Sequence, residues 1–180
     1  MFGKFNYLCL SLLLGACLLL AACGPDRRVA LAERLMAERQ TDSAVAVMYD
    51  LASPPRLSRR DYALRALLLA EAAHRNGRLT AATDTLLIPA IEYFTRSGDS
   101  SYAERALYCK GHLERRLYHS EASIQAFMQA LSFLQGSGDY EQLYRVNTWL
   151  GVVCLNQEEY SGKVRYSKEA LKAALDLGNI

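Results

Sequence analysis

The chain has 180 residues, of which 51% are hydrophobic, and it carries a formal net charge of +2. A chain of this length can form one domain of modest size around a continuous core. So small an excess of positive charge argues against nucleic acid as the main partner, because binding to phosphates needs a strongly basic face.

The first 22 residues have the pattern of a secretory signal peptide. A short positive start at Met1–Lys4 precedes a nearly unbroken apolar run over Leu8–Leu20, and small residues follow. We therefore expect residues 1–22 to be a signal peptide that is removed. An uncleaved anchor helix is the alternative, because Phe5–Ala22 comes close to the roughly 20 residues that span a bilayer.

The end of this segment resembles the lipobox of bacterial lipoproteins. A Leu-Ala-Ala-Cys sequence ends at Cys23, and Gly24 follows it. The resemblance implies cleavage before Cys23 and a diacylglycerol on its thiol, with residues 23–28 as lipidated cysteine and tether. We expect the folded part to lie in the bacterial cell envelope, attached to a membrane by the lipid and facing the periplasm.

A regular spacing organises the rest of the chain. Gly98-Asp99 recurs as Gly138-Asp139 and as Gly178-Asn179, which divides residues 61–180 into three blocks of equal length, 61–100, 101–140 and 141–180. A repeat of this length is one small unit that cannot bury its apolar side alone and is stacked on copies of itself. The glycines are expected to end the second helix of each block in a left-handed turn, and Asp99 and Asp139 to cap the next helix.

Each block has the pattern of two amphipathic helices, because small and apolar residues recur in steps of three and four. In the middle block these are Tyr102, Ala106, Cys109, Leu113 and Leu117, then Phe127, Ala130, Leu131 and Leu134. No run alternates as a strand would, so the sequence predicts an all-α protein.

Residues 29–60 predict a further helical pair before the blocks. Its helices are expected over Val29–Arg39 and Asp42–Leu51, with Asp42 or Ser43 as the cap of the second. Pro54 and Pro55 then end that helix, because proline has no amide hydrogen and forces extended backbone before it.

Three residues inside the predicted helices disfavour helical structure. Gly111 and Gly151 lie mid-helix, where glycine costs roughly 1 kcal/mol relative to alanine. Their recurrence at the same place in successive blocks suggests that the paired helix crosses there too closely for a side chain. Pro89 falls within the second helix of the first block and is expected to kink or interrupt it.

These repeats resemble the tetratricopeptide repeat (TPR) family, whose pattern is Trp-x2-Leu-Gly-x2-Tyr, followed by Ala, an aromatic residue, Ala and a turn. The third block has Leu150-Gly151, Tyr160 and Ala170-Leu171, and the second has Gly111, Phe127 and Ala130-Leu131. The resemblance covers residues 61–180 and implies tandem helix-turn-helix repeats stacked as an α-solenoid, with residues 29–60 as a degenerate unit.

The chain also departs from the family pattern. Lys110 stands where the family has leucine, Glu71 where it has glycine, and Lys163 and Ser167 replace packing residues. Each block is also longer than the family's usual unit of about 34 residues, so the helices or their turns must be longer.

In TPR proteins the first helices line a concave groove, and the resemblance carries its lining positions onto this chain through Gly111 and Gly151. These positions are Arg65, Leu68, Ala72 and Arg75 in the first block, Arg105, Tyr108, His112 and Arg115 in the second, and Arg145, Thr148, Val152 and Leu155 in the third. Arg65, Arg105 and Arg145 then form a ladder that could bind carboxylates of an acidic or C-terminal peptide. Tyr108 would offer a flat apolar contact beside it.

Plainer interpretations of these residues remain open. Arginine is the favoured cation of this chain, with 16 arginines against 4 lysines after Cys23. His112 could tune an anionic contact near neutral pH or could simply be partly buried. Trp149 and Tyr144 could mark an interface or pack within the stack.

Nothing in the sequence predicts an enzyme, a cofactor or a metal site. His74, His112 and His119 belong to no His-Glu-x2-His motif, and no nucleophile elbow or phosphate-binding glycine loop occurs. Cys109 and Cys154 lie five positions apart in block register, an offset of about 7.5 Å along a helix. We therefore expect two buried thiols and no disulfide between them.

The sequence thus favours a lipid-anchored TPR scaffold that binds a protein or peptide in the cell envelope. Two alternatives are an outer-membrane assembly lipoprotein and the sensory N-terminal part of a longer membrane-bound regulator. The last block ends in a helix-stop signal at Asn179 without a polar capping helix. Such an end predicts either self-association through the last repeat or a longer product.

Overall fold

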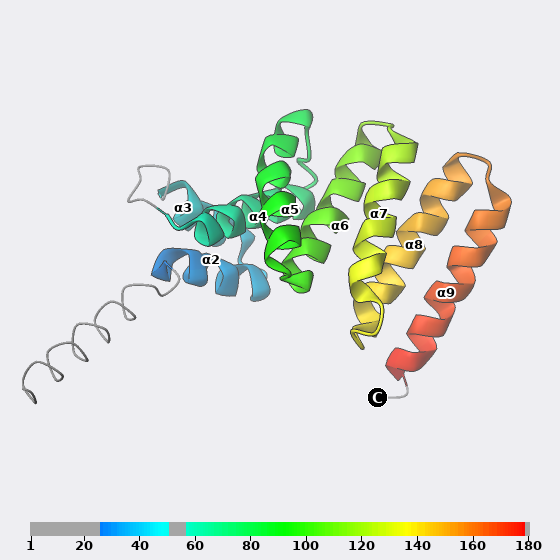
Figure 1. The fold of residues 1–180 in the computed structure, drawn as a ribbon. Helices are drawn as coiled ribbons and strands as arrows, with labels where there is room; N and C mark the ends of the chain where they lie inside the picture. The colour runs from blue at the N-terminus through cyan, green and yellow to red at the C-terminus, as the bar shows by residue number, and fades with distance from the viewer. Residues whose placement is uncertain (1–25, 51–56, 179–180) are drawn as a thin grey trace, which may run out of the picture.

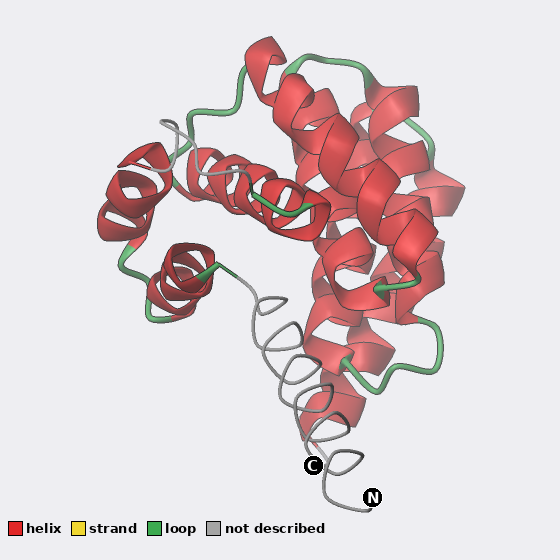
Figure 2. Cartoon of the chain, turned by 60° about the vertical axis from the view of Figure 1, so that its left-hand side comes forward, coloured by secondary structure: helices red, strands yellow, loops and turns green. Residues whose placement is uncertain are grey.

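The computed structural model describes residues 26–50 and 57–178. Within these ranges the secondary structure is entirely helical (Figure 2), so the all-α prediction is confirmed for them. The elements are α2 (Arg27–Ala37), α3 (Thr41–Asp50), α4 (Arg59–Arg75), the short 3-10 helix η1 (Ala81–Thr83), α5 (Asp84–Ser97), α6 (Ser100–Arg116), α7 (Ser120–Leu134), α8 (Tyr140–Asn156) and α9 (Tyr160–Gly178). The predicted signal peptide, Cys23 and the break at Pro54 and Pro55 lie outside the described residues.

The eight α-helices of these ranges pack in consecutive pairs: α2 with α3, α4 with α5, α6 with α7, and α8 with α9. The pairs follow one another across Figure 1 from α2 at the left to α9 at the right. The first helices α2, α4 and α6 also touch in succession. This arrangement is consistent with a helical repeat stack, in which each pair covers the apolar side of its neighbour.

The three blocks share the length of their first helix and a buried position on it. The first helices α4, α6 and α8 each have 17 residues. Ala66, Ala106 and Val146, which hold the same place in successive blocks, are all buried. The block register of the sequence is therefore kept at this position of the structure.

Buried apolar side chains form two main groups that meet at α6. One joins α2, α3, α4 and α5 to Ala103 and Ala106, and the other joins Leu107 and Tyr108 to α7, α8 and α9. Because α6 contributes to both groups, it lies at the centre of the stack and of the cleft described below.

The turn inside every pair has the same backbone geometry. A left-handed residue occupies it each time: Arg39 at φ 61°, Gly77 at 63°, Tyr118 at 63° and Glu158 at 58°. The amide of the following residue then donates to the carbonyl five residues before it, as His119 does to Glu114 at 2.9 Å, which is the Schellman pattern of helix ends. The pair α2–α3 is thus built like the other three.

Several predicted helix ends need correction. Asp42 and Ser43 do not cap α3, because that helix begins at Thr41 and includes them. The Asp139 carboxylate caps α8 by accepting a hydrogen bond from the backbone amide of Gln142 at 3.0 Å. Asp99 stands at the cap position of α6 without such a bond. Gly98 ends α5 with φ 74° as expected, whereas α7 ends at Leu134 with Gln135 as its cap, so Gly138 does not end that helix.

The close helix crossing is confirmed at Gly111 and wrong at Gly151. A Cβ added to Gly111 would lie 2.6 Å from the Phe127 ring of α7, whereas one added to Gly151 would meet Ser167 at an ordinary 3.6 Å. Pro89 does not interrupt α5, which continues through it from Asp84 to Ser97. The irregularity falls earlier, where η1 replaces the first turn of this helix.

Candidate functional site

A cleft of about 490 Å³ runs along the first helices of all four pairs. Its lining comprises Glu33, Met36 and Ala37 of α2, Glu71, His74 and Arg75 of α4, Glu104, Arg105, Tyr108 and Cys109 of α6, and Gln142 and Arg145 of α8. We call it the first-helix cleft. Its volume lies within the range of small-ligand pockets, and its wall is rich in charged groups.

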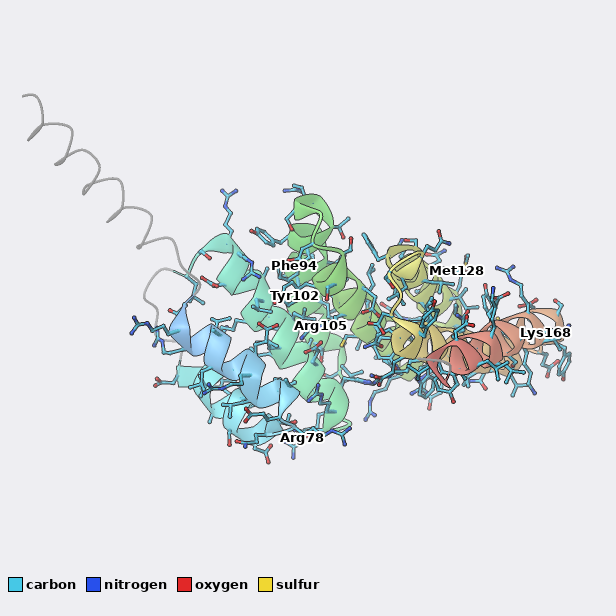
Figure 3. The ribbon with its side chains drawn as sticks, turned by 90° about the horizontal axis from the view of Figure 1, so that it is seen from below. Arg78, Phe94, Tyr102, Arg105, Met128 and Lys168 are labelled. Carbon is cyan, nitrogen blue, oxygen red and sulfur yellow. The ribbon has the colours of Figure 1, made fainter. Side chains whose placement is uncertain are left out.

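Arg105 lies in the cleft, but its guanidinium is already engaged by two carboxylates. Its Nε and Nη2 donate to the two oxygens of Glu71 at 2.8 Å each, and its Nη1 donates to Glu33 at 3.3 Å. These ion pairs raise the pKa of Arg105. Figure 3 shows Arg105 next to Tyr102, and its guanidinium carbon lies 5.1 Å from the centre of the Tyr102 ring. Arg105 therefore ties α2, α4 and α6 together.

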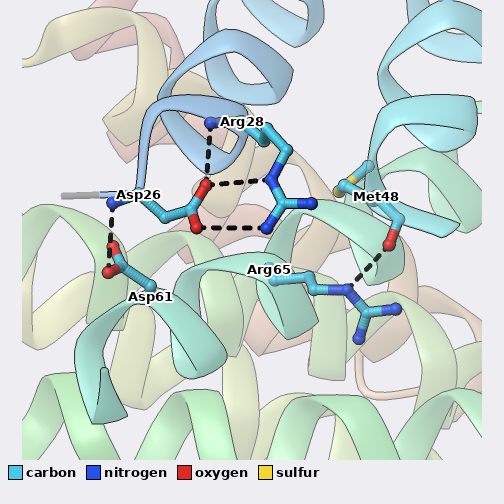
Figure 4. Close-up of polar contacts among 5 residues, drawn as sticks. All are labelled: Asp26, Arg28, Met48, Asp61 and Arg65. Carbon is cyan, nitrogen blue, oxygen red and sulfur yellow. Dashed lines mark hydrogen bonds and ion pairs between the residues drawn. The ribbon is translucent and has the colours of Figure 1, made fainter. Parts of the chain in front are cut away.

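Arg65 is not among the residues that line the cleft. Its Nε donates to the carbonyl oxygen of Met48 at 2.8 Å, near the end of α3 (Figure 4). On the same helix, Asp61 accepts from the backbone amide of Asp26 at 3.2 Å. The first turns of α4 thus fasten the N-terminal pair, and the cleft brings together Arg105 and Arg145 of the predicted ladder but not Arg65.

Two predicted arginines lie on aromatic rings. The guanidinium of Arg145 is 5.4 Å from the centre of the Tyr108 ring, and that of Arg115 is 4.7 Å from the centre of the Trp149 ring. Among the described residues, neither arginine forms an ion pair. Arg145 is exposed at the cleft, so its charge is available to an anionic group.

His112 is buried among other rings and only 2% exposed. The ring centre of His74 lies 4.2 Å away, and those of Tyr108 and Trp149 lie 4.6 Å away. Burial holds the pKa of His112 far below its usual value. The histidine is therefore neutral near pH 7, as the partly buried alternative predicted.

Glu104 and Gln142 line the cleft, although the sequence analysis does not single them out. Glu104 is 4% exposed, yet its Oε1 has no hydrogen-bond partner in the described part of the chain, and neither has the buried Oε1 of Gln142. Burial, reinforced by nearby Asp139, raises the pKa of Glu104 to about 7. A signal was present, because the equivalent positions of the neighbouring blocks are the apolar Leu64 and Tyr144.

Of the remaining predicted groove positions, Arg75 lines the first-helix cleft, and the others divide between the core and the last pair. Leu68 and Ala72 are buried in the core. Thr148, Val152 and Leu155 line a separate, mostly apolar groove of about 360 Å³ between α8 and α9. The predicted line of groove residues thus runs through two separate hollows.

The two cysteines fulfil the prediction of buried, unpaired thiols. Cys109 and Cys154 are both free and buried, and burial raises the pKa of each, that of Cys154 to about 11. Within residues 26–50 and 57–178, no group of three or more metal-ligating side chains is placed to hold an ion. None of the helices in these ranges has the length and apolar character that a membrane span requires.

Comparison with known proteins identifies no family. No protein-family model, no curated protein and no solved structure matches this chain.

Proposed function

We propose that this chain is a TPR-like binding scaffold, attached to a membrane of the bacterial cell envelope through lipid on Cys23. It holds a protein or peptide partner along the first-helix cleft and performs no chemistry of its own. The observation that carries this proposal is the cleft itself, which four successive helix pairs line with charged and aromatic side chains. Stacked helical units commonly provide extended binding surfaces of this kind.

The charges of the cleft favour a segment of mixed charge over a purely acidic one. Arg145 lies exposed over Tyr108 and offers a guanidinium to a carboxylate. Arg105 does not add to this attraction, because Glu71 and Glu33 already neutralise it. Arg75 of the lining is also exposed, so a partner segment with one or two acidic residues fits the cleft better than an acidic run.

Site-specific photo-crosslinking in intact cells tests the scaffold proposal. A photoreactive amino acid replaces Ala37, which is exposed and lines the cleft, or Gln129, which is exposed on α7 outside it. We expect a discrete crosslinked partner from position 37 and none from position 129. The same adducts from both positions, or none from position 37, would contradict a partner in this cleft.

Membrane attachment has an independent test. If Cys23 carries the lipid, Cys23→Ala should leave the precursor uncleaved by a lipoprotein signal peptidase and remove its labelling by a clickable palmitate analogue. Incorporation of the analogue into the variant, measured on an immunoprecipitate, would rule out Cys23 as the attachment site.

Self-association, or a further segment that covers the last pair, is a second candidate for part of the function. It is favoured by the apolar side chains exposed on α9, among them Leu171 at 61% and Leu175 at 60%. If the chain is an outer-membrane assembly lipoprotein or part of a longer regulator, the first-helix cleft would likewise hold a protein or peptide partner. The reading frame beyond Ile180 separates these two alternatives.

A further inference from the structure

Two acceptor atoms of the first-helix cleft have no donor. Glu104 Oε1 on α6 and Gln142 Oε1 on α8 are both buried and unpartnered among the described residues, and both side chains line the cleft. A buried carboxylate without a hydrogen bond destabilises a folded protein, so native structures seldom retain one without a use. Both oxygens are shielded from solvent, so a bound group supplies donors to them by inserting into the wall that these two side chains help to form.

The charged groups around Glu104 are of mixed sign. Asp139 and Glu71 add negative potential at its carboxyl group, while Arg105 and Arg145 oppose it. Arg105, however, donates its side-chain hydrogen bonds to Glu71 and Glu33. Arg145 extends over Tyr108, one helical turn beyond Glu104 on α6. Neither arginine donates a hydrogen bond to Glu104, so a cation from outside can take that place.

A primary ammonium fits these two acceptors better than a guanidinium. An ammonium is a compact charge with three donors that can serve separate oxygen atoms on different helices. A guanidinium is a planar fork that binds best to both oxygens of one carboxylate. Here the unpartnered atoms are one oxygen of a carboxylate and one oxygen of an amide.

We propose that the first-helix cleft binds a primary ammonium group of the partner, with Glu104 Oε1 and Gln142 Oε1 as its acceptors. The group is a lysine side chain or the amino terminus of a chain. This inference rests on the proposed scaffold function and names the chemistry that the cleft recognises.

The ammonium favours the ionised form of Glu104, because an opposite charge nearby stabilises a carboxylate. The affinity should therefore increase as the pH rises through the range in which Glu104 ionises. The fixed charges that face it are those of Asp139, Glu71, Arg105 and Arg145.

Ligand-observed NMR titration of the full chain in a mild detergent, with short probe peptides, tests the proposal. One peptide is blocked at both ends and carries a single lysine, a second has a free amino terminus and no lysine, and a third is blocked with its lysine acetylated. We expect the first or the second to bind, which identifies the source of the ammonium, and the acetylated peptide not to bind.

Glu104→Gln keeps the size of the side chain and removes its charge, so it should weaken binding about tenfold or more. Glu121→Gln, on the exposed surface of α7, is the matched control and should bind like the wild type. Circular dichroism establishes that both variants are folded.

Several results would overturn the proposal. These are binding by neither ammonium peptide, equal binding of the acetylated peptide, an unaffected Glu104→Gln variant, or equal binding of a peptide with arginine in place of lysine. If the crosslink from position 37 persists in that event, the scaffold function stands and only the ammonium assignment fails.

Discussion

Glu104 couples the stability of the fold to the chemistry of the cleft through one side chain. It is buried beside Asp139, and its pKa is raised from an ordinary 4.5 to about 7. Because the folded state holds this proton more tightly than the unfolded chain does, the contribution of Glu104 to stability is complete below pH 4.5. It is lost as the pH rises through 7.

Replacing Glu104 with glutamine should therefore change how stability depends on pH. We expect the free energy of unfolding of the wild type to fall, relative to Glu104→Gln, by about 3 kcal/mol between pH 4.5 and pH 8. Urea denaturation of both proteins at several pH values measures this difference. If the two curves stay parallel, Glu104 ionises normally in the folded protein.

At the scale of the helix, Gly111 and Gly151 show that the same residue at the same repeat position can have different roles. The Phe127 ring fills the space beside Gly111, where an added Cβ would come within 2.6 Å of it. Beside Gly151 the nearest atom would lie at 3.6 Å, an ordinary contact. The first glycine permits a close helix crossing, and the second is a weak point of α8.

Alanine at these two positions should consequently have opposite effects. Gly111→Ala forces the ring to move and should destabilise the protein by about 1–2 kcal/mol, because the cost of overpacking exceeds the gain in helix propensity. Gly151→Ala should stabilise it by about 0.5–1 kcal/mol. Chemical denaturation of the two variants side by side tests the contrast, and changes of the same sign would refute it.

The helices were predictable where periodicity and spacing recur, and the turns were not. Steps of three and four residues located both helices of the second and third blocks. The common left-handed turn escaped detection because only Gly77 among the four turn residues is a glycine, the usual sequence mark of that conformation. The prediction that Pro89 interrupts its helix was wrong, because the missing amide removes only one hydrogen bond from a helix that surrounding contacts hold together.

The candidate site was predictable only in part. Repeat register grouped Arg105, Tyr108 and Arg145 together, and all three line the cleft. It could not foresee that Glu71 and Glu33, from two other helices, would engage Arg105. Such ion pairs depend on the distance between neighbouring helix pairs. The periodicity of residues within a single helix does not encode that distance.

For the molecule as a whole, the last pair presents an apolar face to solvent. Leu171 and Leu175 lie one turn apart on α9 and are each about 60% exposed, and Tyr144 and Leu155 of α8 are also exposed. Neighbouring exposed apolar side chains are common on surfaces that associate with another protein. We infer that the stack is able to associate through α9.

Charge introduced on this face should abolish such association. Leu171→Lys combined with Leu175→Lys should convert an associating protein into a monomer without loss of helix content, since both side chains are exposed. Sedimentation velocity of the full chain in detergent measures the change. Met128→Lys, at an exposed apolar position of α7, is the control and should leave the association intact.

The contact between Gly111 and Phe127 also limits how this sequence can evolve. The Phe127 ring occupies the space that a methyl group on residue 111 would need. A larger side chain at either position therefore requires a smaller one at the other. In related chains the two sites should vary together, with a smaller residue opposite any side chain that replaces the glycine. Such paired exchange would record the crossing of α6 and α7 in sequences alone.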